Sequence, residues 1–356
     1  MKQTFTYFII ALLVSGCSTP PKADNPQQPQ SANRSITGNS DNQQSPSDNR
    51  SATRDLGAST QLPQPNQKGL STPPVKDVKK CADYESAVTK AVQAYHLKVL
   101  EQLLTTLNRQ PDCPVSYLDA IKRSMAQIAA ARADSLVQLG QLAEAETWLK
   151  RAPTMVWGTQ AVYGDIAARR QQWQLAAQFY NQALDLIADP EATPQEPSQT
   201  VIKKVYYLAS EAQILAGNLG AIVSQSGKAS GMMRDNVRGV EFKKRPIPIP
   251  FEYGKTTLGE KGQNSAQRLA GYLKQQNAAH LTLIGHTDSK GSHAVNDKIS
   301  KQRAEAVKKS LQTAGVPTKI TAIGKGKREP LQLANRTLYT PEEIDALNRR
   351  VEFMAN

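Results

Sequence analysis

One stretch of the chain carries residue types that could grip a charged ligand. Asp288 lies just after a short strand-like apolar segment, and Arg303 lies fifteen residues later on the helix expected to follow. Asn296, Ser300 and Arg303 are spaced i, i+4 and i+7, so one helix face carries all three. A carboxylate and a guanidinium held close together can bind a zwitterion, one taking an ammonium group and the other a carboxylate. The spacing therefore predicts a site for an α-amino acid head group, and an ordinary Asp288–Arg303 ion pair is the alternative it leaves open.

The elements that would position these side chains alternate between strand and helix. We expect strands at 246–252, 280–284, 319–323 and 349–355, and helices at 260–276, 294–314 and 341–347. Helix 260–276 gathers Ala266, Leu269, Ala270 and Leu273 on one face, as a helix packed on a sheet does. This order predicts a small α/β (α+β) sandwich, with helices covering one face of a mixed sheet.

The same residues resemble the peptidoglycan-binding OmpA-like domain family. Its motif TD-x2-G-x4-N-x2-LS-x2-RA is matched from Thr287 to Ala304, with Ile299 where Leu is usual. Ile249 to Lys255 looks like the family's first strand and its exit, and Asn348 to Glu352 looks like its closing strand. The resemblance covers about residues 240–356, and we place this domain at 236–356.

The resemblance implies binding to the free α-amino and α-carboxyl groups of diaminopimelate in peptidoglycan stem peptides. By position, Asp288 would accept the ammonium group and Arg303 would pair with the carboxylate. Thr287, Asn296 and Arg349 fall on positions that line the family's pocket. Glu252 stands where many members have Asp, so its reach into the pocket differs. No bond is made or broken in this scheme, which describes a binding module and not an enzyme.

The beginning of the chain is typical of a bacterial lipoprotein. A short apolar run ends in Ser15-Gly16-Cys17, and it is too short to span a bilayer as a helix. We interpret residues 1–16 as a signal peptide and Cys17 as the lipidated residue, carrying acyl chains such as palmitate. Plain cleavage or an uncleaved anchor are the alternatives. The residue after the cysteine is Ser18 and not Asp, which in the enterobacterial sorting rule favours the outer membrane. We expect the protein to face the periplasm. Residues 17–77 are rich in Pro, Gln, Ser and Asn and read as a disordered linker.

The middle of the chain, residues 78–225, reads as helical and contains a repeat. Ala133, Gly140, Ala145, Leu149 and Ala152 recur thirty-one residues later as Gly164, Gln171, Ala176, Tyr180 and Ala183, and a third copy begins near Val201. Small residues at paired positions allow close helix crossings, as in solenoids. The pattern resembles part of a tetratricopeptide repeat, which implies an all-α solenoid with a groove for an envelope protein partner. A plain helical bundle is the alternative.

The two remaining cysteines, Cys81 and Cys113, form an even pair in an exported chain. In the oxidising periplasm a disulfide is favoured over two buried free thiols. Its role would be structural.

Composition and motifs weigh against other classes of function. The chain carries a formal net charge of +13. Most of it lies in 236–356, which contains 21 Lys and Arg residues and 11 Asp and Glu residues. No nucleic-acid motif accompanies this charge, and anionic peptidoglycan or lipid head groups are sufficient partners. A metal site could be built from His286, Asp288 and His293. Two spaced histidines and one carboxylate are a weak signal without a further ligand pattern, so we predict no metal and no cofactor. No catalytic motif is visible.

Together these features predict an outer-membrane lipoprotein that tethers the membrane to the wall. The alternative is a scaffold of an envelope-spanning secretion, pilus or motility machine that recruits its partner through the helical repeats. A third interpretation is a regulator that docks a wall hydrolase or synthase.

Overall fold

The computed structural model describes residues 80–217, 219, 229–247, 249, 251, 253–276 and 278–355. The predicted signal peptide 1–16, the lipidated Cys17, the linker 17–77 and the binding residue Glu252 lie outside the described residues.

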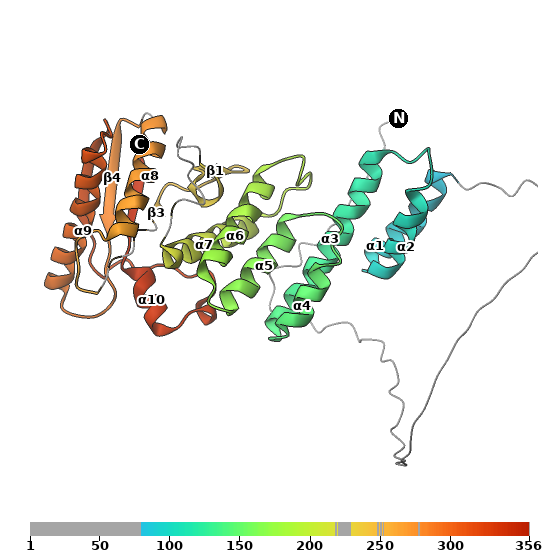
Figure 1. Ribbon diagram of the computed structural model, residues 1–356, viewed down its shortest axis with the longest axis horizontal. Coiled ribbons are helices and arrows are strands. Elements are labelled where there is room, and N and C mark those ends of the chain that lie inside the picture. The colour runs from blue at the N-terminus through green and yellow to red at the C-terminus, as the bar shows by residue number, and fades with distance from the viewer. Residues whose placement is uncertain are drawn as a thin grey trace, which may run out of the picture. The chain divides into compact units, whose positions relative to one another are not determined.

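The first described part of the chain is almost entirely helical, as predicted (Figure 1). Its elements are η1 (Cys81–Tyr84), α1 (Glu85–Gln93), α2 (Leu97–Leu107), α3 (Val115–Gln138), α4 (Leu142–Leu149), α5 (Trp157–Arg169), α6 (Trp173–Ala188) and α7 (Gln199–Ala216). Within the described ranges, no helix combines the length and the apolar character that crossing a membrane requires.

Left-handed residues follow several of these helices. Gly140, Gln171 and Gly217 each follow a long helix and each adopt a positive φ, of 78°, 57° and 63°. A left-handed residue is a common way to end a helix. Gly164 is needed for close packing, because a Cβ there would overlap the ring of Tyr180. This pairing of a small with a large residue lies at the contact between α5 and α6.

Cys81 and Cys113 form a disulfide, with their Cα atoms 5.1 Å apart. The bond joins η1 to the segment before α3. It lies in a separate apolar cluster of the first helices that includes Leu100, Leu107 and Met125. The disulfide therefore closes the end of the helical region farthest along the chain from the sheet.

The C-terminal part is an α/β domain with a mixed sheet, as predicted. It consists of η2 (Gly231–Met233), β1 (Asn236–Val237), β2 (Val240–Glu241), β3 (Arg245–Ile247), α8 (Glu260–Gln276), β4 (His280–Gly285), α9 (His293–Thr313), β5 (Lys319–Gly324), η3 (Arg336–Leu338), α10 (Pro341–Asn348) and β6 (Val351–Ala355). The main sheet has the order β3-β6-β4-β5, in which β4 and β5 are parallel and β6 is antiparallel to both of its neighbours.

The strand that we predicted at 246–252 is shorter in the structure, where it is β3. β3 ends at Ile247, whereas the sequence led us to expect a strand over 246–252. Ile249 and Phe251 are buried although they lie outside the strand. Their burial gives the apolar pattern that the sequence reading took for a longer strand.

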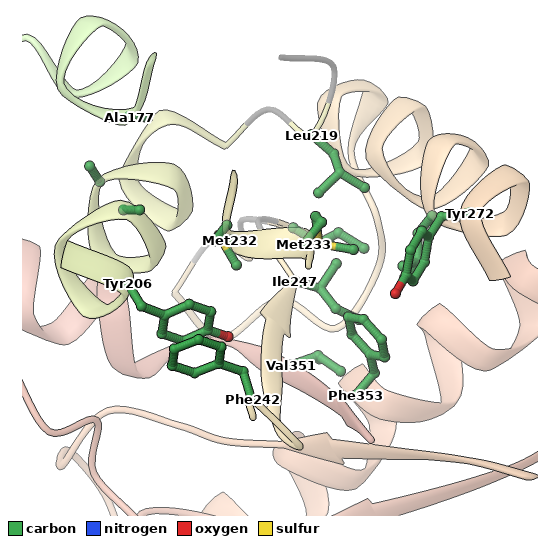
Figure 2. Packing of buried hydrophobic residues seen from close by; sticks show 14 of the residues in the cluster. Ala177, Tyr206, Leu219, Met232, Met233, Phe242, Ile247, Tyr272, Val351 and Phe353 are labelled. Carbon is green, nitrogen blue, oxygen red and sulfur yellow. The ribbon is translucent and has the colours of Figure 1, made fainter. Parts of the chain in front are cut away.

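The last helices of the helical region, α5 to α7, share one continuous apolar core with the sheet domain. Tyr206 of α7 stacks on Phe242, which follows β2, with ring centroids 3.5 Å apart (Figure 2). Met232 and Met233 of η2 are fully buried in the same cluster, together with Phe353 of β6. Two kinds of fold are thus joined by packed side chains.

A second contact joins α6 and α7 to the segment around α10. Glu211 of α7 accepts hydrogen bonds from the Tyr339 hydroxyl at 2.6 Å and from the Ala334 amide at 2.7 Å. Trp173 of α6 stacks on Tyr339, and its indole N–H donates to Glu343 at 2.8 Å. Several aromatic residues of the helices therefore pack against the sheet domain.

Candidate functional site

The turn that carries Asp288 is fixed by backbone hydrogen bonds to residues that flank the two neighbouring strands, β6 and β5. The amide of His286 donates to the carbonyl of Arg350 at 2.9 Å, and the amide of Thr287 donates to that of Gly326 at 3.0 Å. Asp288 is only 4% exposed. The carboxylate is thus held at the carboxyl end of β4, as the sequence predicts.

Helix α9 presents the face that carries Asn296, Ser300 and Arg303 to this turn. Ser292 caps the helix by accepting from the amide of Val295. Asn296, Ser300 and Arg303 are all buried, which confirms that one face carries the three. The Asn296 side-chain amide donates to the carbonyl of Lys290 at 2.8 Å, so it supports the turn that begins at Asp288.

Two paired glycines let α9 approach the sheet closely at this point. Gly285 and Gly324 face each other across the parallel strands β4 and β5. A Cβ at Gly285 would overlap the carbonyl oxygen of Ser300, and one at Gly324 would overlap the Ser300 hydroxyl. Ser300 also accepts a hydrogen bond from the amide of Gly326 at 2.9 Å. The glycines therefore set the depth at which Arg303 lies.

Arg303 is a buried cation with backbone partners. It is 1% exposed and lies over the ring of Phe251, 5.1 Å from its centroid. Its Nε donates to the carbonyl of Lys255 at 3.0 Å, and its Nη1 donates to the carbonyl of His286 at 3.3 Å. Burial and the charge of Arg349 lower its pKa to about 10, against the opposing effect of Asp288. The guanidinium thus remains positive at neutral pH.

Asp288 pairs with a second arginine, Arg349, that directly follows α10. Arg349 Nη1 donates to Asp288 Oδ2 at 3.0 Å, and the amide of Lys290 donates to Asp288 Oδ1 at 3.2 Å. Among the described residues, Arg349 Nε and the Thr287 hydroxyl are buried without a hydrogen-bond partner. One buried carboxylate thus lies among two arginines, and the described residues provide no hydrogen-bond partner for two polar groups beside it.

A neighbouring buried charge cluster escaped the sequence reading. Arg350 Nε donates to Glu352 Oε1 at 2.8 Å, and His286 Nε2 lies 3.5 Å from Glu352 Oε2. Burial alone would raise the pKa of Glu352, but the nearby His286 and the charge of Arg350 together lower it to about 2. Burial lowers the pKa of His286, so we take this imidazole as neutral and Arg350 as the cation that stabilises Glu352. The sequence does carry one sign of this cluster: Arg350 and Glu352 have opposite charges and are two residues apart, so they lie on the same side of an extended segment.

The residues weighed for a metal site do not converge. His286 is fully buried beneath the sheet end, while His293 at the start of α9 is exposed. No group of three or more His, Cys, Asp or Glu side chains suited to a metal occurs in the part of the chain that the structure describes.

Comparison with known protein families identifies the fold that carries this site. The OmpA family model matches residues 250–338. Residues 250–338 are an OmpA-family domain. The match includes β4, α9 and β5, and therefore Thr287, Asp288, Asn296 and Arg303.

Individual relatives match this chain over the same domain. The chain is 36% identical over 107 residues to outer membrane porin F of Pseudomonas fluorescens, covering 30% of this chain and 31% of the porin. It is 35% identical over 105 residues to the peptidoglycan-associated lipoprotein of Legionella pneumophila, covering 29% of this chain and 57% of that protein. Among solved structures, the peptidoglycan-associated lipoprotein from Burkholderia pseudomallei is 27% identical, with a TM-score of 0.27, covering 32% of this chain and 91% of that one.

The chain thus spans about a third of the porin and just over half of the Legionella lipoprotein. Both names place these relatives in the cell envelope, and one of them is associated with peptidoglycan.

Proposed function

We propose that this chain binds peptidoglycan non-covalently through an α-amino acid head group of the stem peptide, that of diaminopimelate. Asp288 accepts the ammonium group, and Arg303 and Arg349 offer donors to the carboxylate. Thr287 and Asn296 shape the pocket, and Glu252 belongs to the same set by its position in the family motif. The observation that carries the proposal is a buried Asp288 among two arginines on an OmpA-family domain.

The balance of charge supports a zwitterion as the ligand. Arg303 and Arg349 contribute two positive charges against the single negative charge of Asp288. An added carboxylate would be attracted by the excess positive charge, and its oxygens could accept from the buried Arg349 Nε. A carboxylate oxygen accepts more than one hydrogen bond, so Asp288 could take an ammonium group while it keeps Arg349. We propose no chemical step, and the domain acts by binding alone.

The remaining parts of the chain suit a tether. In this proposal residues 1–16 are removed, Cys17 carries the lipid that anchors the protein in the outer membrane, and 17–77 span the distance toward the wall in the periplasm. The helical region 78–225, a tetratricopeptide-like array, then recruits an envelope protein.

One observation favours the scaffold as a second function. Helices α5 to α7 share a core with the sheet domain, in which Tyr206 stacks on Phe242, and Glu211 of α7 also accepts a hydrogen bond from Tyr339. A packed core resists independent movement of the two parts better than a linker does. A partner bound to the helices would therefore be fixed firmly to the wall, as a large envelope machine requires.

Sedimentation with purified diaminopimelate-type sacculi tests the proposal. The chain from Ser18 onward is compared with Asp288→Asn, which keeps the shape of the side chain, and Arg303→Lys, which keeps a positive charge. We expect at least a tenfold loss of affinity for each, about 1.4 kcal/mol or more. Asp288→Asn would leave the ammonium group without a counter-charge, and Arg303→Lys cannot reproduce the planar donor fork of arginine. Lys319→Ala, at an exposed residue of β5, is the control for lost charge.

Two results would contradict the proposal. Wild type that stays in solution would show that the site does not bind the wall. Variants that sediment as well as wild type, with circular dichroism confirming their fold, would show that binding uses another surface.

A further inference from the structure

A pocket of about 430 Å³ lies beside the turn that carries Asp288. Its wall includes Thr287 and Ser289, the two neighbours of Asp288 in the chain, and Asn348, which precedes Arg349. The other lining residues come from the segment that follows β5 and from α10: Lys327, Pro330, Arg336, Pro341, Ile344 and Asp345. The pocket therefore adjoins the head-group site but is built largely from different residues.

We infer that this pocket binds a carboxylate carried by a residue next to diaminopimelate in the stem peptide. The inference rests on the proposed function, because it needs the head group bound at Asp288. It adds a second subsite with its own residues and its own chemical preference.

The charges around the pocket favour an anion. Arg336 is exposed, and the described part of the chain provides no partner for its guanidinium. Lys327 brings a second positive charge while it donates to the carbonyls of Ser289 and Gly291 at 3.1 and 2.7 Å. Asp345 would repel an anion, but its carboxylate is paired with Lys290 Nζ at 2.8 Å. The lining residues thus leave an excess of positive charge.

An unused hydroxyl strengthens the case. Thr287 is 5% exposed, and its Oγ1 is buried with no hydrogen-bond partner among the described residues. A buried hydroxyl without a partner is unfavourable, and a ligand oxygen would relieve this cost. Because Thr287 directly precedes Asp288, a ligand that reached both residues would extend from the head-group site into the pocket.

The apolar part of the wall limits what carries the carboxylate. Pro330, Pro341 and Ile344 offer no hydrogen-bond donor from their side chains, and they suit a short aliphatic group. In a stem peptide, D-glutamate precedes diaminopimelate with a free α-carboxylate and two methylene groups. D-alanine follows it with a terminal carboxylate and a methyl group. Both supply the chemistry that the pocket fits, and the test below separates them.

Calorimetric titration with synthetic peptides distinguishes the two sources. The peptides are L-Ala-γ-D-Glu-diaminopimelate, the same tripeptide with D-isoglutamine, and the tripeptide extended by D-Ala. If D-glutamate fills the pocket, amidation weakens binding to the chain from Ser18 onward about tenfold. If D-alanine fills it, the added residue tightens binding about tenfold. In both cases the difference disappears in Arg336→Ala and persists in Lys319→Ala.

Equal affinity of wild type for the three peptides would overturn the inference, as would a preference that survives in Arg336→Ala. Free diaminopimelate separates this outcome from failure of the proposed function, because it reaches only the head-group site. It should bind wild type and Arg336→Ala alike and Asp288→Asn weakly. Wild type that binds neither diaminopimelate nor any peptide would overturn both proposals.

Discussion

Glu211 offers a quantitative test of the contact between the helical region and the OmpA-family domain. Its carboxylate is 1% exposed and accepts from the Tyr339 hydroxyl and the Ala334 amide. Burial raises its pKa from 4.5 to about 7, although these two hydrogen bonds oppose the shift. The folded protein therefore prefers the protonated form of Glu211 more strongly than the unfolded chain does.

The sign of the pH dependence follows from this difference. Below about pH 4.5 the group is protonated in both states, and its full contribution to stability is present. As the pH rises, the unfolded chain releases the proton first, so this contribution is lost until the pH passes about 7. A shift of this size corresponds to about 3 kcal/mol, at 1.36 kcal/mol for each pKa unit.

Glu211→Gln removes the titration and keeps a similar shape with one oxygen acceptor. The measurement is the free energy of unfolding in urea, for wild type and Glu211→Gln, at several pH values between 4.5 and 8. We expect the difference between the two proteins to move by about 3 kcal/mol in favour of the variant as the pH rises. Glu144→Gln, at an exposed position of α4, should run parallel to wild type. If Glu211→Gln also runs parallel to wild type, burial at this contact does not raise the pKa of Glu211 in the folded protein.

Three further outcomes are expected. Gly324→Ala should lower the free energy of unfolding by about 2 kcal/mol in urea titrations and weaken sedimentation with sacculi, because its Cβ pushes α9 off the sheet. Phe242→Ala should lower it by about 3 kcal/mol through loss of the stack on Tyr206, whereas Tyr253→Ala, at a side chain 68% exposed, should change it little. Reducing the Cys81–Cys113 bond, whose residues are 32 apart, should cost about 3–4 kcal/mol and expose amides of the first helices to hydrogen exchange before those of the sheet.

Much of the C-terminal domain could be predicted because its signals are local. The apolar face of 260–276 predicts α8, and Thr340 before Pro341 predicts the start of α10, where the capping hydrogen bonds are present. The length of the strand predicted at 246–252 was overestimated. Ile249 and Phe251 are buried outside the strand, and buried side chains at every second position look the same in the sequence whether or not the segment pairs with a sheet. Local pattern thus fixes the elements better than their ends.

The residues of the candidate site were also predictable only where the signal is local in the sequence. Spacing placed Asn296, Ser300 and Arg303 on one buried helix face, and the motif marked Asp288 as the carboxylate at the strand end. The ion pair of Asp288 with Arg349 joins residues 61 positions apart in the chain, and no periodicity connects them. The roles of these residues in binding remain predictions for the sacculus and peptide experiments.

By itself the sequence determined the types of element and the chemical groups at their ends, because helix and strand periods, caps and turn glycines act over a few residues. Only the tertiary structure decided which of those groups meet. The stack of Tyr206 on Phe242, the burial of Glu211 against Tyr339 and the pocket beside Thr287 all join segments that are distant in the chain. Their contacts depend on the depth and register at which packed elements come to rest, and close packing sets these for the whole domain at once.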